Sequence, residues 1–446
     1  MRHKAPLRKF WLRTLAMSVV PLALGIGTAA VHAQDDDEDK RKYEDIETQQ
    51  RQAVGRECGA VLEDVQTITE EEKWQQALNT LQTKGRNACQ TSYEKSQVSN
   101  FLGYVFYSLE RYQDAIRAYT NMVNEPEADP KQAISTRYTI AQLYMIIEDY
   151  ANAARQLEIW MEQSPIVGSD AKVLLAQAYY QVDRKNDSLR LVEEAINEQE
   201  AKGNLPKESW WSLQRVLYYE KNDYRKVVDI LKKLIRHYPS FSYWRQLGGM
   251  YGELGAEMNQ LVATEMPYLA GEMDQERQLL SLAYMYMGAS APYRGARIIE
   301  EGMQAGQIER NAENLEVLGM AWQQAQSSDK ALPVLEQAAQ KSGEGEIYSR
   351  LAGVYLDLDQ NEKAVAAARN AVRRGDLKRT GMTYMNLGSA LVNLHCYDDA
   401  IKAFRQSAKY DDSKKYATRW IQYAEKEGER RAKLIESGAD IATCQI

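Results

Sequence analysis

The stretch MTYMNLGSALVNLHCYDDAIKAFRQSAK, residues 382–409, predicts two short helices joined by a tight turn. Met382 to Leu394 has the pattern of an amphipathic helix, His395-Cys396-Tyr397-Asp398 that of a turn, and Asp399 to Lys409 that of a second helix. A small residue such as Gly388 lets the backbone of a neighbouring helix approach closely, and a large side chain one turn along fills the space beside it. The stretch therefore predicts two antiparallel helices that pack at a small-residue contact.

The same spacing recurs nine times between Ser96 and Lys414, in a frame of roughly 34 residues. The units begin near positions 96, 134, 169, 208, 241, 276, 312, 345 and 381. The residue at the eighth place is small in every unit but one: Gly103, Ala141, Ala176, Arg215, Gly248, Ala283, Gly319, Ala352 and Gly388. The eleventh place is aromatic in every unit but the last: Phe106, Tyr144, Tyr179, Tyr218, Tyr251, Tyr286, Trp322, Tyr355 and Leu391. The twentieth place holds Ala115, Ala153, Ser188, Val227, Ala331, Ala364 and Ala400, with Ala296 one residue late in the sixth unit and no match in the fifth.

This pattern resembles the tetratricopeptide repeat family, whose Leu-Gly, aromatic, Ala, aromatic order stands here as Leu102-Gly103, Phe106, Ala115 and Tyr119. The resemblance covers about 320 of the 446 residues. It implies an all-α fold, an α-solenoid of about nine helix-turn-helix units with capping helices.

Several places depart from the family pattern. Only Pro165 and Pro239 occupy the closing proline place, and Arg215 stands where a small residue is expected. The fifth unit loses register after Gly255, and Met266-Pro267 within it should end or kink a helix because proline lacks the amide donor. Two interpretations of this segment remain open: divergence of the repeat sequence, or a hinge in the array.

The N-terminal segment has the pattern of an export signal over residues 1–33. A basic start, the apolar run Leu15 to Ala30 and the small residues of Val31-His32-Ala33 predict cleavage after Ala33. An uncleaved inner-membrane anchor facing the periplasm is the alternative, since Trp11 to Val31 is almost long enough to span a bilayer. An acidic leader (34–53), an N-terminal helical cap (54–95), the repeat array (96–412) and a C-terminal capping helix with a tail (413–446) are expected to follow.

Charge excludes some partners. The first 33 residues hold five of the 56 Lys and Arg residues and no acid, so the remainder has 51 bases against 63 acids, a net charge of −12. Nucleic acid binding depends on basic patches, so a nucleic acid partner is not expected. After the signal no stretch has the length and apolarity of a membrane span.

Four cysteines agree with an oxidising compartment. They allow three pairings, of which we favour Cys58 with Cys89 and Cys396 with Cys444. Each of these bonds would tie a terminal element to the array, where fraying is most expected.

No residues with the pattern of a catalytic, cofactor or metal site emerge. Only His237 and His395 remain after the signal, far apart and without a second ligand nearby. The glycines from Gly248 to Gly255 lie in a helical frame with no preceding strand, so we interpret them as close helix packing rather than a nucleotide loop. The sequence therefore favours a binding protein over an enzyme, with no small-molecule substrate.

In the family that the repeats resemble, the second, fifth, ninth and twelfth places of the first helices face the ligand along a concave groove. That resemblance implies a partner-binding groove formed by Asn100, Tyr104, Tyr107, Tyr138, Gln142, Met145, Gln177, Tyr180, Val216, Tyr219, Arg245, Tyr284, Met287, Met320, Gln323, Met382 and Met385. Tyrosine offers contact area with a hydroxyl group, and methionine adapts to irregular partners. An extended peptide or a partner helix is the expected occupant.

The whole chain, with its export signal, cysteine-bearing cap and long array, looks like the periplasmic repeat proteins associated with TonB-type energy-transducing systems. That resemblance implies an exported, non-catalytic scaffold in the periplasm whose partners are TonB, ExbB or ExbD relatives. The alternative is an assembly factor of another envelope machine, in secretion, polysaccharide export or a peptidoglycan complex.

Overall fold

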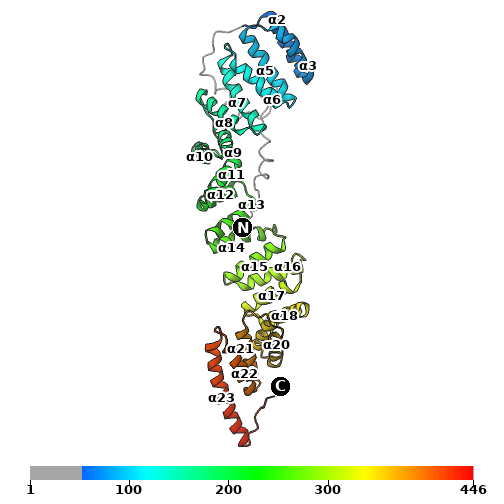
Figure 1. The fold of residues 1–446 in the computed structure, drawn as a ribbon, viewed down its shortest axis with the longest axis vertical. Helices are drawn as coiled ribbons and strands as arrows, with labels where there is room; N and C mark the ends of the chain where they lie inside the picture. Colours follow the sequence, from blue (N-terminus) through cyan, green and yellow to red (C-terminus); the bar gives the residue numbers. More distant parts are fainter. Residues whose placement is uncertain (1–52, 445–446) are drawn as a thin grey trace. The chain divides into compact units, whose positions relative to one another are not determined.

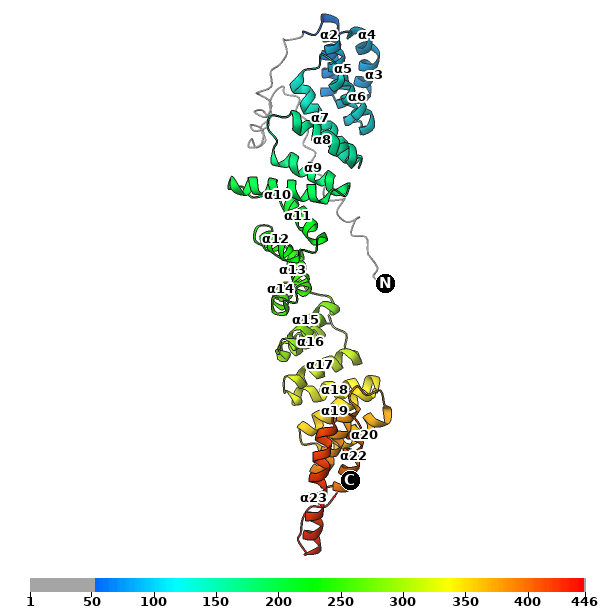
Figure 2. The same ribbon diagram turned by 60° about the vertical axis from the view of Figure 1, so that its left-hand side comes forward.

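The computed structural model describes residues 53–444, and every regular element in this range is helical. The chain divides into two compact units, unit 1 up to Asp223 and unit 2 from Tyr224. Within each unit, successive helices lie side by side in antiparallel pairs (Figures 1 and 2). The expected all-α fold of tetratricopeptide-type helix pairs is therefore confirmed, whereas the predicted signal and most of the acidic leader lie outside the described residues.

Unit 1 begins with the cap, which consists of α2 (Arg56–Glu70), α3 (Trp74–Thr80), a π-helical turn (Leu81–Gly85) and α4 (Arg86–Ala88). The repeat helices that follow are α5 (Ser92–Ser108), α6 (Tyr112–Asn124), α7 (Pro130–Ile146), α8 (Tyr150–Gln163), α9 (Ser169–Gln181), α10 (Lys185–Ala201) and α11 (Glu208–Glu220). Helices α5, α7, α9 and α11 are the first helices of their repeats.

Unit 2 contains α12 (Tyr224–His237), α13 (Phe241–Glu253), α14 (Glu257–Leu269), α15 (Glu276–Gly288), α16 (Pro292–Gln304), α17 (Ala312–Gln324), α18 (Ser328–Ser342), α19 (Gly345–Asp357), α20 (Asn361–Arg374), α21 (Thr380–Asn393), α22 (Tyr397–Ser407) and α23 (Lys414–Glu436). Helix α22 begins at Tyr397, so the turn of the ninth repeat is shorter than predicted. The odd-numbered helices from α13 to α21 are first helices.

One backbone feature marks the turn of every repeat. The fifteenth place has a left-handed conformation in all nine units, with φ from 55° at Gln326 to 66° at Gly255. In the ninth unit the turn is closed by bonds from the amide of His395 to the carbonyl of Val392 and from the amide of Cys396 to that of Leu391. This arrangement caps the end of the first helix and starts the second at a fixed angle.

The close helix approach predicted at the eighth place is confirmed. A Cβ atom added at Gly388 would lie 2.5 Å from the ring of Phe404, and one added at Gly103 would lie 2.5 Å from the ring of Tyr119. In both pairs the ring of the second helix therefore rests on the backbone of the first.

The fifth unit keeps its register, contrary to the prediction. Helix α14 contains Pro267 and continues to Leu269, so Met266-Pro267 does not end it. The twentieth place is occupied by Gln260, and Gly252 opposite leaves room for it, because a Cβ atom there would lie 2.9 Å from the Gln260 amide nitrogen. A long side chain against a glycine thus replaces the usual small residue.

The sixth unit is also in register at the twentieth place. Gly295 occupies that place, and a Cβ atom there would lie 2.7 Å from the carbonyl oxygen of Ala283 at the eighth place. The sequence pattern had matched Ala296, one residue after the twentieth place. The residue that makes the helix contact is its neighbour Gly295.

A hydrogen bond recurs between consecutive repeats. The tyrosine at the eleventh place of one unit donates its hydroxyl to the glutamate at the twenty-fifth place of the unit before. The pairs are Tyr179 with Glu158 at 2.7 Å, Tyr355 with Glu336 at 2.5 Å, Tyr218 with Glu193, and Tyr286 with Glu265. We call these the tyrosine–glutamate bonds.

Cations reinforce several of these bonds. The guanidinium of Arg184 lies 3.8 Å from the ring centroid of Tyr179 and also donates to Glu158 at 2.7 Å. Burial and the hydrogen bond to Glu158 raise the pKa of Tyr179 to about 12. The phenol is therefore neutral at physiological pH and acts as the donor.

The cap is joined to the first repeat by a buried carboxylate. Glu94, only 5% exposed, accepts hydrogen bonds from the amides of Gly55, Gln90 and Thr91 at 2.8, 2.9 and 3.0 Å. The backbone amides of Thr91 and Gly55 hold the pKa of Glu94 below its usual value. This carboxylate therefore ties the start of α2 to the start of α5.

Disulfides hold both ends of the described chain. Cys58 pairs with Cys89 across the cap, and Cys396, before α22, pairs with Cys444 in the tail. These are the pairings favoured from the sequence. Each bond restricts the freedom of the unfolded chain at one end of the described range.

Candidate protein-binding surface

The predicted groove residues of unit 1 lie on α5, α7, α9 and α11. Of these side chains, only Tyr219 is classed as exposed, at 47%. Tyr104 meets Trp74 of α3 edge to face at 5.6 Å, and Tyr180 donates its hydroxyl to Glu220 at 2.9 Å. The half-buried members are Asn100, Tyr104, Tyr107, Tyr138, Gln142, Met145, Gln177, Tyr180 and Val216.

The predicted groove residues of unit 2 differ more in exposure. Arg245 and Tyr284 are exposed, and Met287, Met320, Gln323 and Met382 are half-buried. Met385 is only 7% exposed and belongs to a core that also contains Ala417 of α23. Met385 is therefore the one buried member of the predicted set in unit 2, and it presents almost no surface to a partner.

Successive first helices adjoin one another in unit 2. A Cβ atom at Gly353 of α19 would lie 3.4 Å from the amide nitrogen of Gln323 on α17 and 3.4 Å from that of Asn386 on α21. Ser349 and Thr383 share a hydrogen bond of 2.6 Å between α19 and α21. The half-buried Gln323 thus borders a surface formed by three helices, which we call the first-helix surface of unit 2.

The assignment from the sequence missed an ionic cluster on this surface. The guanidinium of Arg350 contacts the carboxylate of Glu316 at 2.8 Å and that of Glu346 at 3.4 Å. All three side chains are about one-fifth exposed or less. Glu316 and Glu346 stand at the fifth and second places of their units, so the same frame rule could have found them.

Acidic side chains also influence Tyr284 of α15. Burial raises the pKa of Tyr284, and the negative charges of Glu313 and Glu316 raise it further. Its hydroxyl therefore stays neutral, and the negative charge of the two acids favours a cationic group of a partner nearby.

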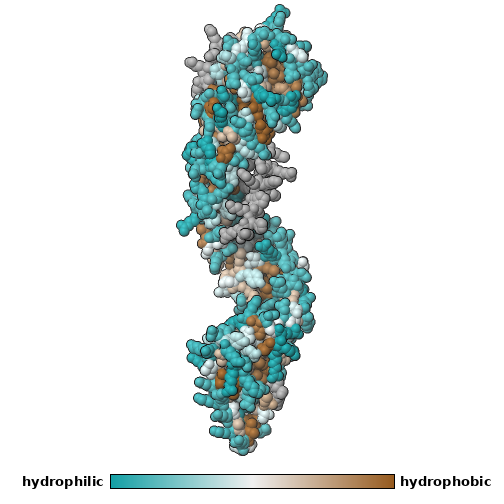
Figure 3. All heavy atoms as spheres, in the orientation of Figure 1, coloured by the Kyte–Doolittle hydropathy of each residue, from teal (hydrophilic) through white to brown (hydrophobic). Residues whose placement is uncertain are grey.

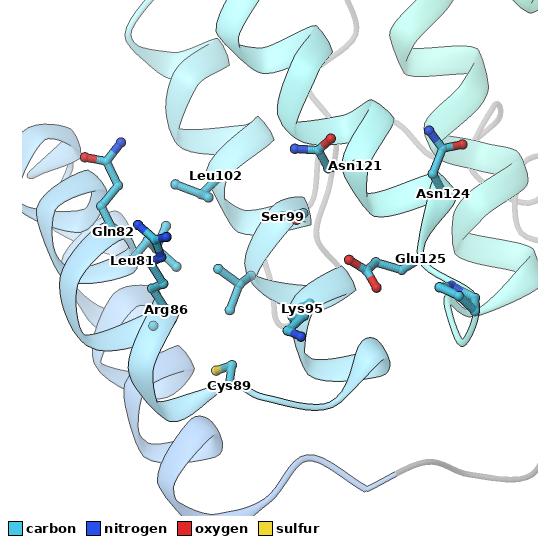
Figure 4. Close-up of a pocket in the computed structure, with 13 residues that line it drawn as sticks. Leu81, Gln82, Arg86, Cys89, Lys95, Ser99, Leu102, Asn121, Asn124 and Glu125 are labelled. Carbon is cyan, nitrogen blue, oxygen red and sulfur yellow. The ribbon is translucent and has the colours of Figure 1, made fainter.

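An open cavity of about 930 Å³ lies between the cap and the first repeat (Figure 4). Apolar, amide and charged side chains all contribute to its lining. It is lined by Leu81, Gln82, Gly85, Arg86, Cys89, Lys95, Val98, Ser99, Leu102, Asn121, Asn124, Glu125 and Pro126. The disulfide of Cys89 holds one wall, and no residue of the predicted groove contributes to this cavity.

A further apolar surface lies on α14. The molecular surface seen in Figure 3 is mostly hydrophilic, with hydrophobic residues in patches between. Met258, Val262 and Leu269 of α14 are 60%, 49% and 66% exposed. Their spacing places them on one side of the helix, where the fifth unit presents apolar side chains to solvent.

His237 and His395, the two histidines considered as catalytic or metal-binding residues, lie in different parts of the fold. His237 is exposed at the end of α12, and His395 occupies the left-handed turn before α22, with its ring 6.4 Å from that of Tyr397. No group of three or more His, Cys, Asp or Glu side chains within residues 53–444 is arranged to hold a metal ion. Among the helices of that same range, none combines the length and apolarity that a bilayer crossing requires.

Comparison with known proteins leaves the family open. No protein-family model matches this chain, and no curated protein matches it either. A crystal structure of MamA protein aligns with 40% of this chain and 94% of its own, at 18% identity and a TM-score of 0.34. The crystal structure of the APC/C hetero-tetramer Cut9-Hcn1 aligns with 84% of this chain and 91% of its own, at 12% identity and a TM-score of 0.33. Similarities of this size carry no argument about function.

Proposed function

We propose that this protein is a non-catalytic scaffold of the bacterial cell envelope that binds other proteins through the first helices of its repeats. The observation that supports the proposal best is an exposed tyrosine at a groove place of a first helix in each of the two units. Tyr219 at the twelfth place in unit 1 and Tyr284 at the ninth place in unit 2 are 47% and 48% exposed. Exposed tyrosines of this kind are enriched where proteins bind one another.

The proposed compartment is the periplasm. The two disulfides favour an oxidising environment. The basic and apolar pattern of residues 1–33 supports export, with an uncleaved inner-membrane anchor as the alternative form. The narrower proposal is a role beside TonB, ExbB or ExbD relatives, and it rests on resemblance alone.

In-cell photo-crosslinking tests this proposal. A photoreactive residue at Tyr180 or Tyr219 should capture an envelope protein, whereas one at Arg155, exposed on the second helix α8, should not. Capture of a TonB, ExbB or ExbD relative supports the narrower role, and capture of a secretion, polysaccharide-export or peptidoglycan protein replaces it with the alternative. Capture from Arg155 alone would contradict the assignment of the binding surface.

A further inference from the structure

The repeat frame can be extended into helix α23, although Gln422 stands there at the eighth place instead of a small residue. A frame that begins 34 residues after the ninth unit places Glu425 at the eleventh place and Arg405 at the twenty-fifth place of the unit before. These two side chains form an ion pair at 3.3 Å, in the position that the tyrosine–glutamate bonds occupy in earlier repeats. The register of the array therefore continues into the helix predicted to be its cap.

This register gives α23 its own set of groove places. The second, fifth, ninth and twelfth places are Tyr416, Arg419, Tyr423 and Lys426. Tyr416 is 58% exposed and Tyr423 is 49% exposed. Trp420 lies between them, with its ring 5.5 Å from that of Tyr423 and stacked on Phe404 at 5.7 Å. We call Tyr416, Arg419, Trp420, Tyr423 and Lys426 the terminal patch.

The terminal patch is unlike the polar end that a repeat array requires to stay soluble. At the equivalent fifth place of α21, Met385 is only 7% exposed, whereas Arg419 at the fifth place of α23 is exposed. Within residues 53–444 no further helix follows α23, so three large aromatic side chains remain accessible. Tryptophan and tyrosine are the residues that most often dominate binding energy at protein interfaces.

The charges beside these rings are positive. Arg419, Lys426 and the neighbouring Lys415 are exposed, and among residues 53–444 no carboxylate lies within ion-pair distance of them. Two acids of the same helix are engaged, Glu425 with Arg405 and Glu427 with Arg430 at 2.5 Å, whereas Glu429 and Glu436 are exposed beyond the patch. The patch therefore presents unpaired cations on a chain whose net charge is −7.

We propose that the terminal patch is a docking site for an acidic peptide segment of a partner protein. The apolar side chains of that segment pack on the rings of Tyr416, Trp420 and Tyr423, and its carboxylates face Arg419 and Lys426. This inference rests on the proposed scaffold function and extends it to one end of the array. A second copy of the chain is disfavoured, because antiparallel pairing of two α23 helices would bring two basic edges together.

The test uses the purified full chain and a short fluorescent peptide of alternating Glu-Leu-Asp-Phe, with a matched peptide that has Lys in place of each acid. Fluorescence anisotropy should detect the acidic peptide only. The double variant Arg419→Glu with Lys426→Glu should weaken binding about tenfold or more, as should Tyr416→Ala with Tyr423→Ala. The matched control is Lys232→Glu with Arg236→Glu, two exposed cations of α12, which should leave the affinity unchanged.

Salt and folding controls complete the design. Raising the salt concentration from about 0.05 M to about 0.3 M should weaken wild-type binding and reduce the difference caused by the charge reversals. Circular dichroism should show unchanged helicity for all variants, because the substituted side chains are exposed.

Several results would overturn the proposal. These are equal binding of the lysine peptide, equal binding by the charge-reversed variant, or binding only to phosphatidylglycerol vesicles. Dimerisation of the wild type that the Tyr416→Ala with Tyr423→Ala variant abolishes would identify a second copy as the occupant. Crosslinking from Tyr219 is measured in the same variants, so failure of the terminal patch and failure of the scaffold function are distinguishable.

Discussion

Replacing Tyr355 with Phe should destabilise unit 2 by about 1.5 kcal/mol, because it removes one tyrosine–glutamate bond. The Tyr355 hydroxyl lies 2.5 Å from a carboxylate oxygen of Glu336, and Tyr355 is only 9% exposed. A hydrogen bond to a charged group contributes about 1.5–3 kcal/mol. Glu336 is half-buried and water can solvate it once the phenol is gone, so the lower end of that range applies.

Urea unfolding followed by circular dichroism measures the change, with a double-mutant cycle of Tyr355→Phe and Glu336→Gln. The two substitutions should show a coupling energy of about 1 kcal/mol. Tyr251→Phe is the matched control, because the twenty-fifth place before it holds Lys232 and offers no carboxylate. Strictly additive effects in the cycle, or an equal loss in the control, would refute the assignment of energy to this bond.

Four further predictions concern the packing of repeats and the ends of the chain. Gly388→Ala should lower the free energy of unfolding, measured with urea, by about 1–3 kcal/mol, because the added Cβ atom meets the ring of Phe404. Gly249→Ala should raise that free energy slightly, because no atom lies within 4 Å of its added Cβ atom. If both substitutions changed the free energy in the same direction, the close-packing argument would be contradicted. Glu94→Gln should lower the free energy of unfolding by about 2 kcal/mol and expose the amides of α2 to hydrogen exchange. Because the pKa of Glu94 is lowered in the folded state, its contribution to stability should decrease as the pH falls below about 4.3. Folding raises the pKa of Tyr179 to about 12, so its contribution to folding stability should be complete below about pH 10 and should be lost as the pH rises through 12. Melting temperatures measured across this alkaline range would show the loss. Reducing both disulfides should lower the free energy of unfolding by about 3 kcal/mol for each bond. An unchanged melting temperature in reductant would argue against their structural role.

The spacing of residues within each repeat was sufficient to predict most of the fold. The eighth place had to be small wherever a ring of the second helix rests on the first, as Gly388 does beneath Phe404, and such a steric requirement leaves a direct trace in the sequence. The fifth unit concealed its register because a long side chain, Gln260, had exchanged size with Gly252 across the helix contact. A rule that scores each place separately cannot detect a compensation between two places.

The binding surface was less accessible to sequence reasoning. A place in the frame predicts the direction of a side chain on its own helix, but accessibility depends on what packs against that helix. Met385 and Tyr416 both stand at groove places, yet Met385 is 7% exposed and Tyr416 is 58% exposed.

The sequence by itself determined that this chain is a set of antiparallel helix pairs and where each pair turns, because these properties depend on neighbours within one repeat. It also predicted the cysteine pairing, because each pair lies near one end of the array. The tertiary structure alone decided which tyrosines meet the glutamates of the preceding repeat, that Glu425 of α23 pairs with Arg405, and which tyrosines remain exposed. Those properties arise from contacts between repeats, and such contacts depend on how one helix pair stacks on the next.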